Sequence, residues 1–282
     1  MRPIDNSEKW LEIINSKSAA EMLTERELEC WNNISPENKS RYIKALIEKP
    51  IVFENPEIIY DWYFRNKWAT ALKTVCHQES ISVFEIGAGG CDIVPKAVSM
   101  KFCHPKTRYF TANLNKELTQ IFKWKTEVDP IDIYVIEDDA ANIKTYVGEN
   151  AFDAIVFEHS VNDVLETILA EKNGIDTVNC GWMDILPTIT EVVNREWGNE
   201  TFEKNTKGEF LKLINTCVDV LKPGGWLVFA HYQFQYNLDI GLSPELNQNI
   251  IPIVRKWISD SNIGKEYFFD GFDSNWWMFV RI

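Results

Sequence analysis

The chain has 282 residues, of which 45% are hydrophobic, and it carries a formal net charge of −13. This length accommodates one α/β domain of ordinary size plus an appendage, and the apolar content supports a sizeable core. The negative charge disfavours a broad electrostatic grip on nucleic acid or on an anionic membrane. We therefore expect a small-molecule substrate, with no nucleic-acid partner and no membrane partner.

The six cysteines are scattered along the chain without a CxxC pair, which argues against a disulfide framework and against a structural zinc site. No apolar run approaches the ~20 residues that a membrane-spanning helix needs. No apolar segment typical of a signal peptide follows Met1. The expectation is a cytoplasmic protein with reduced thiols and no bound metal.

Residues 1–76 have the pattern of helices and give no strand signal. Thr24 with Glu27 three positions later has the form of a capping box. Ser35 places a capping side chain before Pro36, which suits a first helical turn. The sequence therefore predicts an N-terminal helical cap over residues 1–76.

The last predicted helix of this cap is rich in aromatic residues that cover more than one helical face. One interpretation is that they pack the cap onto a sheet. The other is that they cover the cofactor or line the substrate pocket. In so acidic a protein, aromatic rings in that pocket would suit a cationic acceptor. The aromatic residues are Tyr60, Trp62, Tyr63, Phe64 and Trp68. Tyr60 and Tyr63 are the candidates for substrate contact.

A strand, a glycine-rich turn and a helix follow one another after the cap. Ile81 to Ile86 is a short, mostly apolar run, as expected of a strand buried on both faces of a parallel sheet. Gly87 to Gly90 form the turn, and a helical pattern begins at Ile93. Such a turn lets a ligand approach the backbone closely and aims free N–H groups at it. Glu85 adds an acceptor beside it, so the stretch indicates a cofactor-binding turn.

The identity of the cofactor depends on the spacing of the glycines. A dinucleotide fingerprint requires a third glycine at the sixth position of the turn, where this chain has Asp92. The stretch Glu85-Ile-Gly-Ala-Gly-Gly-Cys91 instead resembles motif I of the class I S-adenosylmethionine-dependent methyltransferases, with Cys91 where a glycine is common. The resemblance implies S-adenosylmethionine as the cofactor. It also implies four cofactor-binding residues here, Glu85, Gly87, Ala88 and Gly89.

The next two predicted strands are Arg108–Asn113 and Asp132–Ile136. In the resembled family the second strand ends in an acid that binds both ribose hydroxyls, and sequence order places Asn113 there. The family's adenine-binding acid aligns with Asp139 or with its neighbour Asp138. The resemblance thus implies five more cofactor-binding residues, which are Asn113, Leu114, Asp138, Asp139 and Ala140.

A fourth strand over residues 151–157 delivers Glu158 and His159 at its carboxyl end. Ligands bind at this edge of open α/β sheets, and the family's fourth motif lies here beside the reactive methyl group. We expect Glu158 at the cofactor site and His159 as the catalytic residue, because a neutral imidazole accepts a proton near pH 7. A purely structural role of His159 is the alternative.

The segment from about 166 to 206 is longer than a simple crossover helix and contains Trp182. We interpret it as an insertion that shapes the substrate pocket, with Trp182 as a substrate contact. The alternative is an extra helical pair that serves packing or dimerisation, so a homodimer is left open.

The turn Leu221-Lys-Pro-Gly-Gly225 ends a helix and begins a buried strand. It closely resembles the turn before the fifth strand of class I methyltransferases, in the order along the chain that the family requires. His231 follows this strand and is a further candidate for substrate contact. Two closing strands, over residues 265–269 and 276–282, match the family's sixth and seventh strands, the last one antiparallel.

The prediction is an α/β fold with a seven-stranded, mostly parallel, doubly wound sheet whose last strand is antiparallel. The N-terminal helical cap covers residues 1–76, and the methyltransferase domain covers residues 77–282. The resemblance implies methyl transfer from S-adenosylmethionine to an oxygen, nitrogen or sulfur atom of a small molecule. A catalytically silent methyltransferase-like binding subunit is the first alternative, and Asn113 favours it. A nicotinamide-dependent oxidoreductase is the second.

Overall fold

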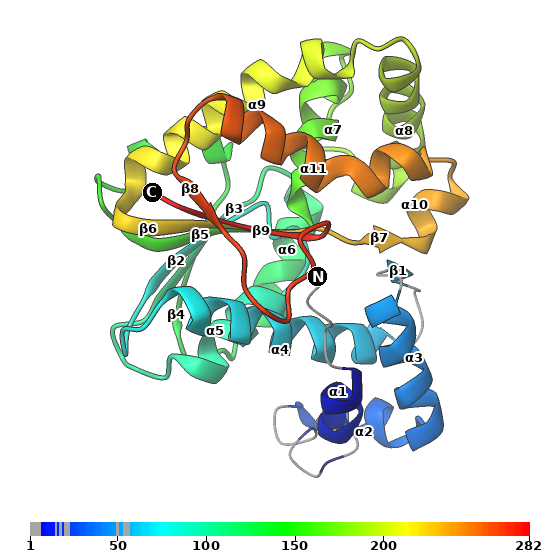
Figure 1. Ribbon diagram of the computed structural model, residues 1–282, viewed down its shortest axis with the longest axis vertical. Helices are drawn as coiled ribbons and strands as arrows, with labels where there is room; N and C mark the ends of the chain where they lie inside the picture. The colour runs from blue at the N-terminus through cyan, green and yellow to red at the C-terminus, as the bar shows by residue number, and fades with distance from the viewer. Residues whose placement is uncertain (1–6, 15, 17–18, 20–22, 49–50, 53–56) are drawn as a thin grey trace.

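The structure is a computed structural model that describes residues 7–14, 16, 19, 23–48, 51–52 and 57–282. Its centre is a seven-stranded sheet in the order β4-β3-β2-β5-β6-β9-β8 (Figure 1). The strands are β2 (Ser82–Ile86), β3 (Arg108–Ala112), β4 (Asp132–Ile136), β5 (Phe152–Glu158), β6 (Leu221–Ala230), β8 (Lys265–Tyr267) and β9 (Trp277–Arg281). The strands β2 to β6 run parallel, whereas β9 is antiparallel to both of its neighbours. The predicted sheet is therefore confirmed.

Helices cover both faces of the sheet (Figure 1). One face packs against α4 (Glu57–Val75), α5 (Ile93–Lys101) and α6 (Lys116–Thr126), and the other against α7 (Ser160–Lys172), α9 (Phe202–Val220) and α11 (Pro244–Asp260). Strand residues alternate between the two cores because successive side chains of a strand point to opposite faces. In β5, Ala154 and Val156 belong to the first core, and Ile155 and Phe157 belong to the second.

Three short helices, α1 (Ser7–Ile14), α2 (Glu25–Asn32) and α3 (Pro36–Glu48), pack around α4. The capping box of Thr24 and Glu27 at the start of α2 is present in both of its hydrogen bonds. The predicted cap shares its core with the sheet, because Trp68 of α4 and Val83 of β2 are buried in one continuous cluster.

The expectation that residues 1–76 contain no strand is wrong at one place. β1 (Ile51–Val52) pairs in parallel with β7 (Gln233–Phe234), which is followed by α10 (Gln235–Asp239). A strand of only two residues depends on a partner strand far away in the chain, so no local sequence pattern predicts it.

The long segment between β5 and α9 forms α7 and α8 (Trp182–Gly198). The loop between these two helices is tied to the end of β3: Nδ2 of Asn115 donates to the carbonyl oxygens of Thr177 and Cys180, both at 2.9 Å. The insertion therefore lies beside the glycine turn.

All six cysteines are free thiols. Within the described ranges, no helix has the length and apolar character that crossing a membrane requires. The same ranges contain no group of three or more His, Cys, Asp or Glu side chains placed to hold a metal ion.

Candidate functional site

The glycine turn begins where β2 ends, next to the point where the strand order reverses between β2 and β5. Gly87 and Gly89 have φ angles of +63° and +57°, a left-handed conformation that glycine adopts at no steric cost. A Cβ on Gly90 would come within 3.0 Å of Cγ2 of Ile121. Backbone conformation therefore favours glycine at Gly87 and Gly89, and at Gly90 a Cβ would require Ile121 to shift.

The sequence suggested that the N–H groups of the turn are free to bind a ligand, but three of them are bonded within the protein. Gly87 donates to the carbonyl oxygen of Ala112 at 3.1 Å, and Ala88 donates to Oγ1 of Thr111 at 3.3 Å. Gly89 donates to Oδ1 of Asn113 at 3.1 Å. The end of the neighbouring strand β3 thus uses these three donors. The turn is therefore fastened to β3 and does not form an anion-binding nest.

Asn113 lies at the end of β3 and is only 2% exposed. In addition to accepting from the N–H group of Gly89, its amide donates from Nδ2 to the carbonyl oxygen of Gly89 at 2.9 Å. The hydroxyl of Thr111 reaches the same Oδ1 atom at 3.4 Å. The amide of Asn113 is therefore used to fasten the turn to β3.

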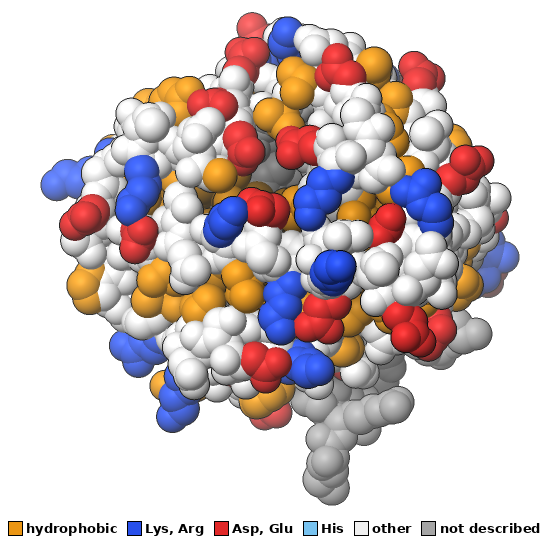
Figure 2. Space-filling model, turned by 90° about the horizontal axis from the view of Figure 1, so that it is seen from above, with side chains coloured by type: hydrophobic (Ala, Val, Ile, Leu, Met, Phe, Trp, Pro, Cys, Tyr) orange, Lys and Arg blue, Asp and Glu red, His pale blue; other side chains and the backbone are white. Residues whose placement is uncertain are grey.

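A cavity of about 440 Å³ opens at the carboxyl ends of β2, β3 and β4. It brings together five of the residues that the sequence assigned to a cofactor: Gly87, Leu114, Asp138, Asp139 and Ala140. The opposite wall is helical, with Asp163, Val164, Thr167 and Ile168 from α7 and Leu213 from α9. Seen from above, the surface is hollowed near its middle, and acidic and basic side chains surround the hollow (Figure 2).

A smaller cavity of about 80 Å³ lies on the side of the glycine turn. Gly87, Leu114, Asp163 and Thr167 line both cavities, so the two meet at these residues. The small cavity also contacts Gly89, Asn113 and Trp182. Trp182, predicted as a substrate contact, therefore lies beside the turn.

The two aspartates after β4 differ in what they leave available. Asp138 accepts from the N–H group of Asp139 and from Asn142 on Oδ1, and from the hydroxyl of Tyr146 on Oδ2. Asp139 accepts from the N–H group of Ala141 on Oδ1 at 2.8 Å, and caps the short 3₁₀ helix η2 (Ala140–Thr145). Asp139 keeps Oδ2 for a ligand, which favours it over Asp138 for recognition of an amino group.

Two buried carboxyl groups lie behind the turn, at the ends of β2 and β5. The hydroxyl of Tyr109 donates to Glu85, and burial raises the pKa of Glu85 well above its usual value. Glu158 accepts from the indole of Trp68 and from the hydroxyl of Tyr232. Burial raises the pKa of Glu158 to about 8. Neither carboxyl group lines the two cavities described above.

Tyr60, predicted as a substrate contact, belongs to the same buried hydrogen-bond chain. Its hydroxyl is bonded to that of Tyr232, which in turn is bonded to Glu158. Tyr63, the second predicted contact on α4, has other partners: its ring packs edge-on against Trp10, with the ring centroids 4.9 Å apart, and Nζ of Lys67 lies 5.8 Å from the Tyr63 ring centroid. At spacing i and i+3 the two tyrosines are neighbours on α4, and both rings pack against Phe64, but only the Tyr60 hydroxyl joins the hydrogen-bond chain to Glu158.

His159 follows β5 directly, in the left-handed conformation with φ +53°. Its ring stacks on His231 at 5.0 Å and on Tyr232 at 4.5 Å. Burial and the neighbouring His231 lower the pKa of His159 well below its usual value, so its imidazole is neutral at pH 7. Its Nδ1 atom has no hydrogen-bond partner among the described residues.

His231 extends this stack and is anchored by α11. Nε2 of His231 lies 2.8 Å from Oδ1 and 3.0 Å from the carbonyl oxygen of Asn247. A carbonyl oxygen only accepts, so the proton sits on Nε2 and Nδ1 is left as an acceptor. Burial lowers the pKa of His231 to about 4. The two predicted histidines are thus brought together, although neither lines the two cavities at the turn.

A buried arginine connects the cap to the glycine turn. Arg65 of α4 reaches Glu27 of α2 at 2.7 Å and Asp92, directly after the turn, at 3.0 Å. Burial lowers the pKa of Arg65, but the carboxylates of Asp92, Asp61 and Glu27 outweigh that effect and raise it. The carboxylate of Asp92, which stands where a dinucleotide fingerprint has its third glycine, is thus held by an ion pair.

Asp163 and Thr167 were not singled out from the sequence, although both line the site. They follow the end of β5 at helical spacing i and i+4, so the signal in the sequence was a row of polar residues on one side of the helix after the strand.

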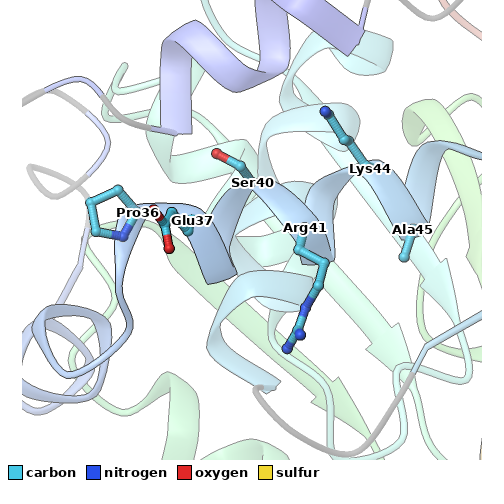
Figure 3. Close-up of a pocket in the computed structure, with 6 residues that line it drawn as sticks. All are labelled: Pro36, Glu37, Ser40, Arg41, Lys44 and Ala45. Atoms are coloured by element: carbon cyan, nitrogen blue, oxygen red, sulfur yellow. The ribbon is translucent and has the colours of Figure 1, made fainter.

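A separate hollow of about 660 Å³ lies along α3, with Pro36, Glu37, Ser40, Arg41, Lys44 and Ala45 (Figure 3). It takes no residue from the sheet edge and is not part of the candidate site.

Comparisons with protein-family models and with curated proteins found no match. Among solved structures, a SAM-dependent methyltransferase from Aquifex aeolicus is 14% identical, with a TM-score of 0.47, over 76% of this chain and 87% of that chain. An S-adenosylmethionine-dependent methyltransferase from Clostridium acetobutylicum is 14% identical, with a TM-score of 0.36, over 59% and 50%. One from Thiobacillus denitrificans in complex with S-adenosyl-L-homocysteine is 14% identical, with a TM-score of 0.33, over 58% and 48%.

Proposed function

We propose that this chain is an S-adenosylmethionine-dependent methyltransferase that acts on a small molecule and leaves S-adenosylhomocysteine. One observation carries the proposal: a single cavity joins the left-handed Gly87 to Leu114, Asp139 and Ala140, at the ends of three neighbouring parallel strands. Ligands of open α/β sheets bind at this edge.

The cavity fits a nucleoside without phosphates. Asp139 offers a carboxylate oxygen to the exocyclic amine of an adenine, and Leu114 offers an apolar surface to the ring. The turn passes below with its N–H groups of Gly87, Ala88 and Gly89 already bonded to β3. A pyrophosphate would need those donors, which argues against the nicotinamide-dependent alternative.

Burial favours the protonated forms of Glu85 and Glu158 near the turn, and a ligand with positive charge would favour their ionised forms. Glu85, Asp92 and Glu158 act electrostatically on one another or on Cys91, so they lie close together behind the turn. When bound, S-adenosylmethionine supplies an electrophilic methyl group on a sulfonium and also carries an ammonium group. The chain's own part is to hold that methyl group in line with the acceptor and to exclude water.

Positioning is expected to contribute more than proton transfer. Holding two reactants in line contributes roughly 7–11 kcal/mol. A general base adds a factor of about 10²–10⁴, which is roughly 3–5 kcal/mol. For a hydroxyl or protonated-amine acceptor, the neutral imidazole of His159 is our candidate for the base.

Calorimetric titration with S-adenosylmethionine and S-adenosylhomocysteine tests the proposal. We expect binding of both at micromolar or tighter affinity, and no binding of NADH. A panel of phenols, amines and thiols, with release of S-adenosylhomocysteine as the readout, then finds the acceptor. Binding without transfer to any acceptor would favour the silent binding subunit, and absence of binding would contradict the proposed function.

A further inference from the structure

The ribose of the proposed cofactor needs a hydrogen-bond acceptor that the expected residue does not supply. Two neighbouring hydroxyl groups are best recognised by one carboxylate, because its two oxygens accept both hydroxyl protons in charge-assisted bonds. The residue aligned with that task is Asn113, and both ends of its amide are bonded to the backbone of Gly89. Releasing the amide would also release the turn.

Asp163 is the carboxylate at the centre of the site. It is one of the four residues that line both cavities, together with Gly87, Leu114 and Thr167. The adenine end of the large cavity lies at Asp139 and Ala140, and the small cavity lies at the turn. The junction between them is therefore the place of the sugar in a nucleoside that spans both.

The other acids of the cavity are less suited to this task. Asp138 has both carboxylate oxygens engaged, and Asp139 lies at the adenine end. Glu171 is two helical turns beyond Asp163 on α7, about 12 Å along the axis at 1.5 Å per residue. Glu209 lies on α9, a helix that contributes no residue to the small cavity.

The carboxylate of Asp163 is both oriented and available. Nδ2 of Asn162 donates to its Oδ1 atom at 2.8 Å, whereas Oδ2 has no hydrogen-bond partner among the described residues. Burial raises the pKa of Asp163, and the buried Glu166 lies one turn further along α7. Such a desolvated carboxylate is stabilised by a ligand that donates two hydroxyl protons to it.

We propose that Asp163 on α7, oriented by Asn162, accepts the ribose hydroxyls of the cofactor, in place of the residue at the end of β3. Asn113 then has the separate task of holding the glycine turn. The inference rests on the proposed function, since it assigns a residue to the same ligand. It gives α7 the role of recognising the nucleoside.

The test compares S-adenosylhomocysteine with its 2′-deoxy counterpart by calorimetry, in the wild type and in variants. In the wild type, loss of one hydroxyl should weaken binding about tenfold, as expected of one charge-assisted hydrogen bond. In Asp163→Asn, affinity for S-adenosylhomocysteine should fall roughly tenfold to hundredfold, and most of the difference between the two ligands should disappear. Asp163→Ser is the second variant if the amide disturbs the fold.

Two control variants separate this role from a structural one. Glu203→Gln changes an exposed acid that lines neither cavity and should leave both affinities unchanged. Asn113→Ala should lower the thermal midpoint but keep the ratio between the two ligands. The inference is overturned if that ratio persists in both Asp163 variants, or if it is lost in Asn113→Ala. If the wild type binds neither ligand, both the proposed function and this inference are wrong.

Discussion

At the scale of single residues, buried charges and polar groups decide how the site is held. The carboxylates of Glu27 and Asp92 converge on one guanidinium, and the Asn113 amide bridges two strand ends. Truncating one partner of a buried charge pair is costly because it leaves the other charge without compensation. Residues of this kind should therefore affect stability and cofactor affinity in separable ways.

Replacing the buried Arg65 by methionine should lower the free energy of unfolding by about 3 kcal/mol, since Asp92 would stay buried beside the turn without its partner. Urea unfolding measures the effect. The exposed pair of Lys207 and Glu203 provides the control, because Lys207→Met should change the stability by no more than about 0.5 kcal/mol. Equal effects of the two variants would contradict the structural role of Arg65.

Replacing His159 by alanine tests its assignment as the general base. Turnover should fall by a factor of about 10²–10⁴, while the affinity for S-adenosylhomocysteine is kept, because His159 lines neither of the two cavities proposed for the cofactor. Steady-state kinetics and calorimetry measure the two quantities. His77, an exposed histidine, is the control position. Unchanged turnover in His159→Ala would remove it from the mechanism.

At the scale of elements, the strand–turn–helix unit of β2, the glycine turn and α5 is the part on which the others converge. The end of β3 provides acceptors for the N–H groups of the turn, and Arg65 of α4 forms an ion pair with Asp92. The loop before α8 accepts a hydrogen bond from Asn115, which follows β3. Its conformation is therefore held from three directions.

The left-handed conformation of Gly87 allows a matched pair of substitutions. Gly87→Ala and Gly174→Ala both place a Cβ at positive φ, +63° and +72°, and each should cost about 1–2 kcal/mol of stability. A Cβ at Gly174 meets no atom within 4 Å, whereas Gly87 lines the proposed cofactor cavity. Only Gly87→Ala should therefore weaken binding of S-adenosylhomocysteine in calorimetry. Equal affinities of the two variants would place the ligand elsewhere.

At the scale of the whole molecule, burial of many ionisable groups under one sheet edge makes stability depend on pH. His159 and His231 have lowered pKa values, so their contribution is complete once the pH exceeds about 6.5. Carboxyl groups with raised pKa values act in the opposite direction, because the folded state keeps their protons. Burial raises the pKa of four of them: Glu85, Glu158, Asp163 and Glu166.

The free energy of unfolding should therefore fall as the pH rises from about 6.5 to 8 in the absence of cofactor. The pKa of Glu158 is about 8 in the folded state against an ordinary 4.5, so its contribution is present below 4.5 and is lost as the pH rises through 8. Urea unfolding at several pH values measures the slope. Glu158→Gln should flatten it, and Glu203→Gln, at an exposed position, should not. A stability that increases over this window would refute the prediction.

By itself, the sequence determined where the sheet strands lie along the chain and the place of the glycine turn. Apolar runs such as residues 151–157 and glycines at strand ends are local patterns, and each reports the conformation of its own segment. The edge that carries the site follows from them, since parallel strands end at one edge of the sheet. The resemblance to class I methyltransferases assigned Leu114, Asp139 and Ala140 to one cofactor site, and the three residues line one cavity.

The tertiary structure alone decided the direction and the partners of the side chains. It gave Tyr60 and Tyr63 different partners, bonded the amide of Asn113 to the glycine turn, and brought Asp163 of α7 into the cavity. The physical reason is that hydrogen-bond partners and burial come from segments far apart in the chain. Ile51–Val52 is the smallest case, because it is a strand only where Gln233–Phe234 lies beside it.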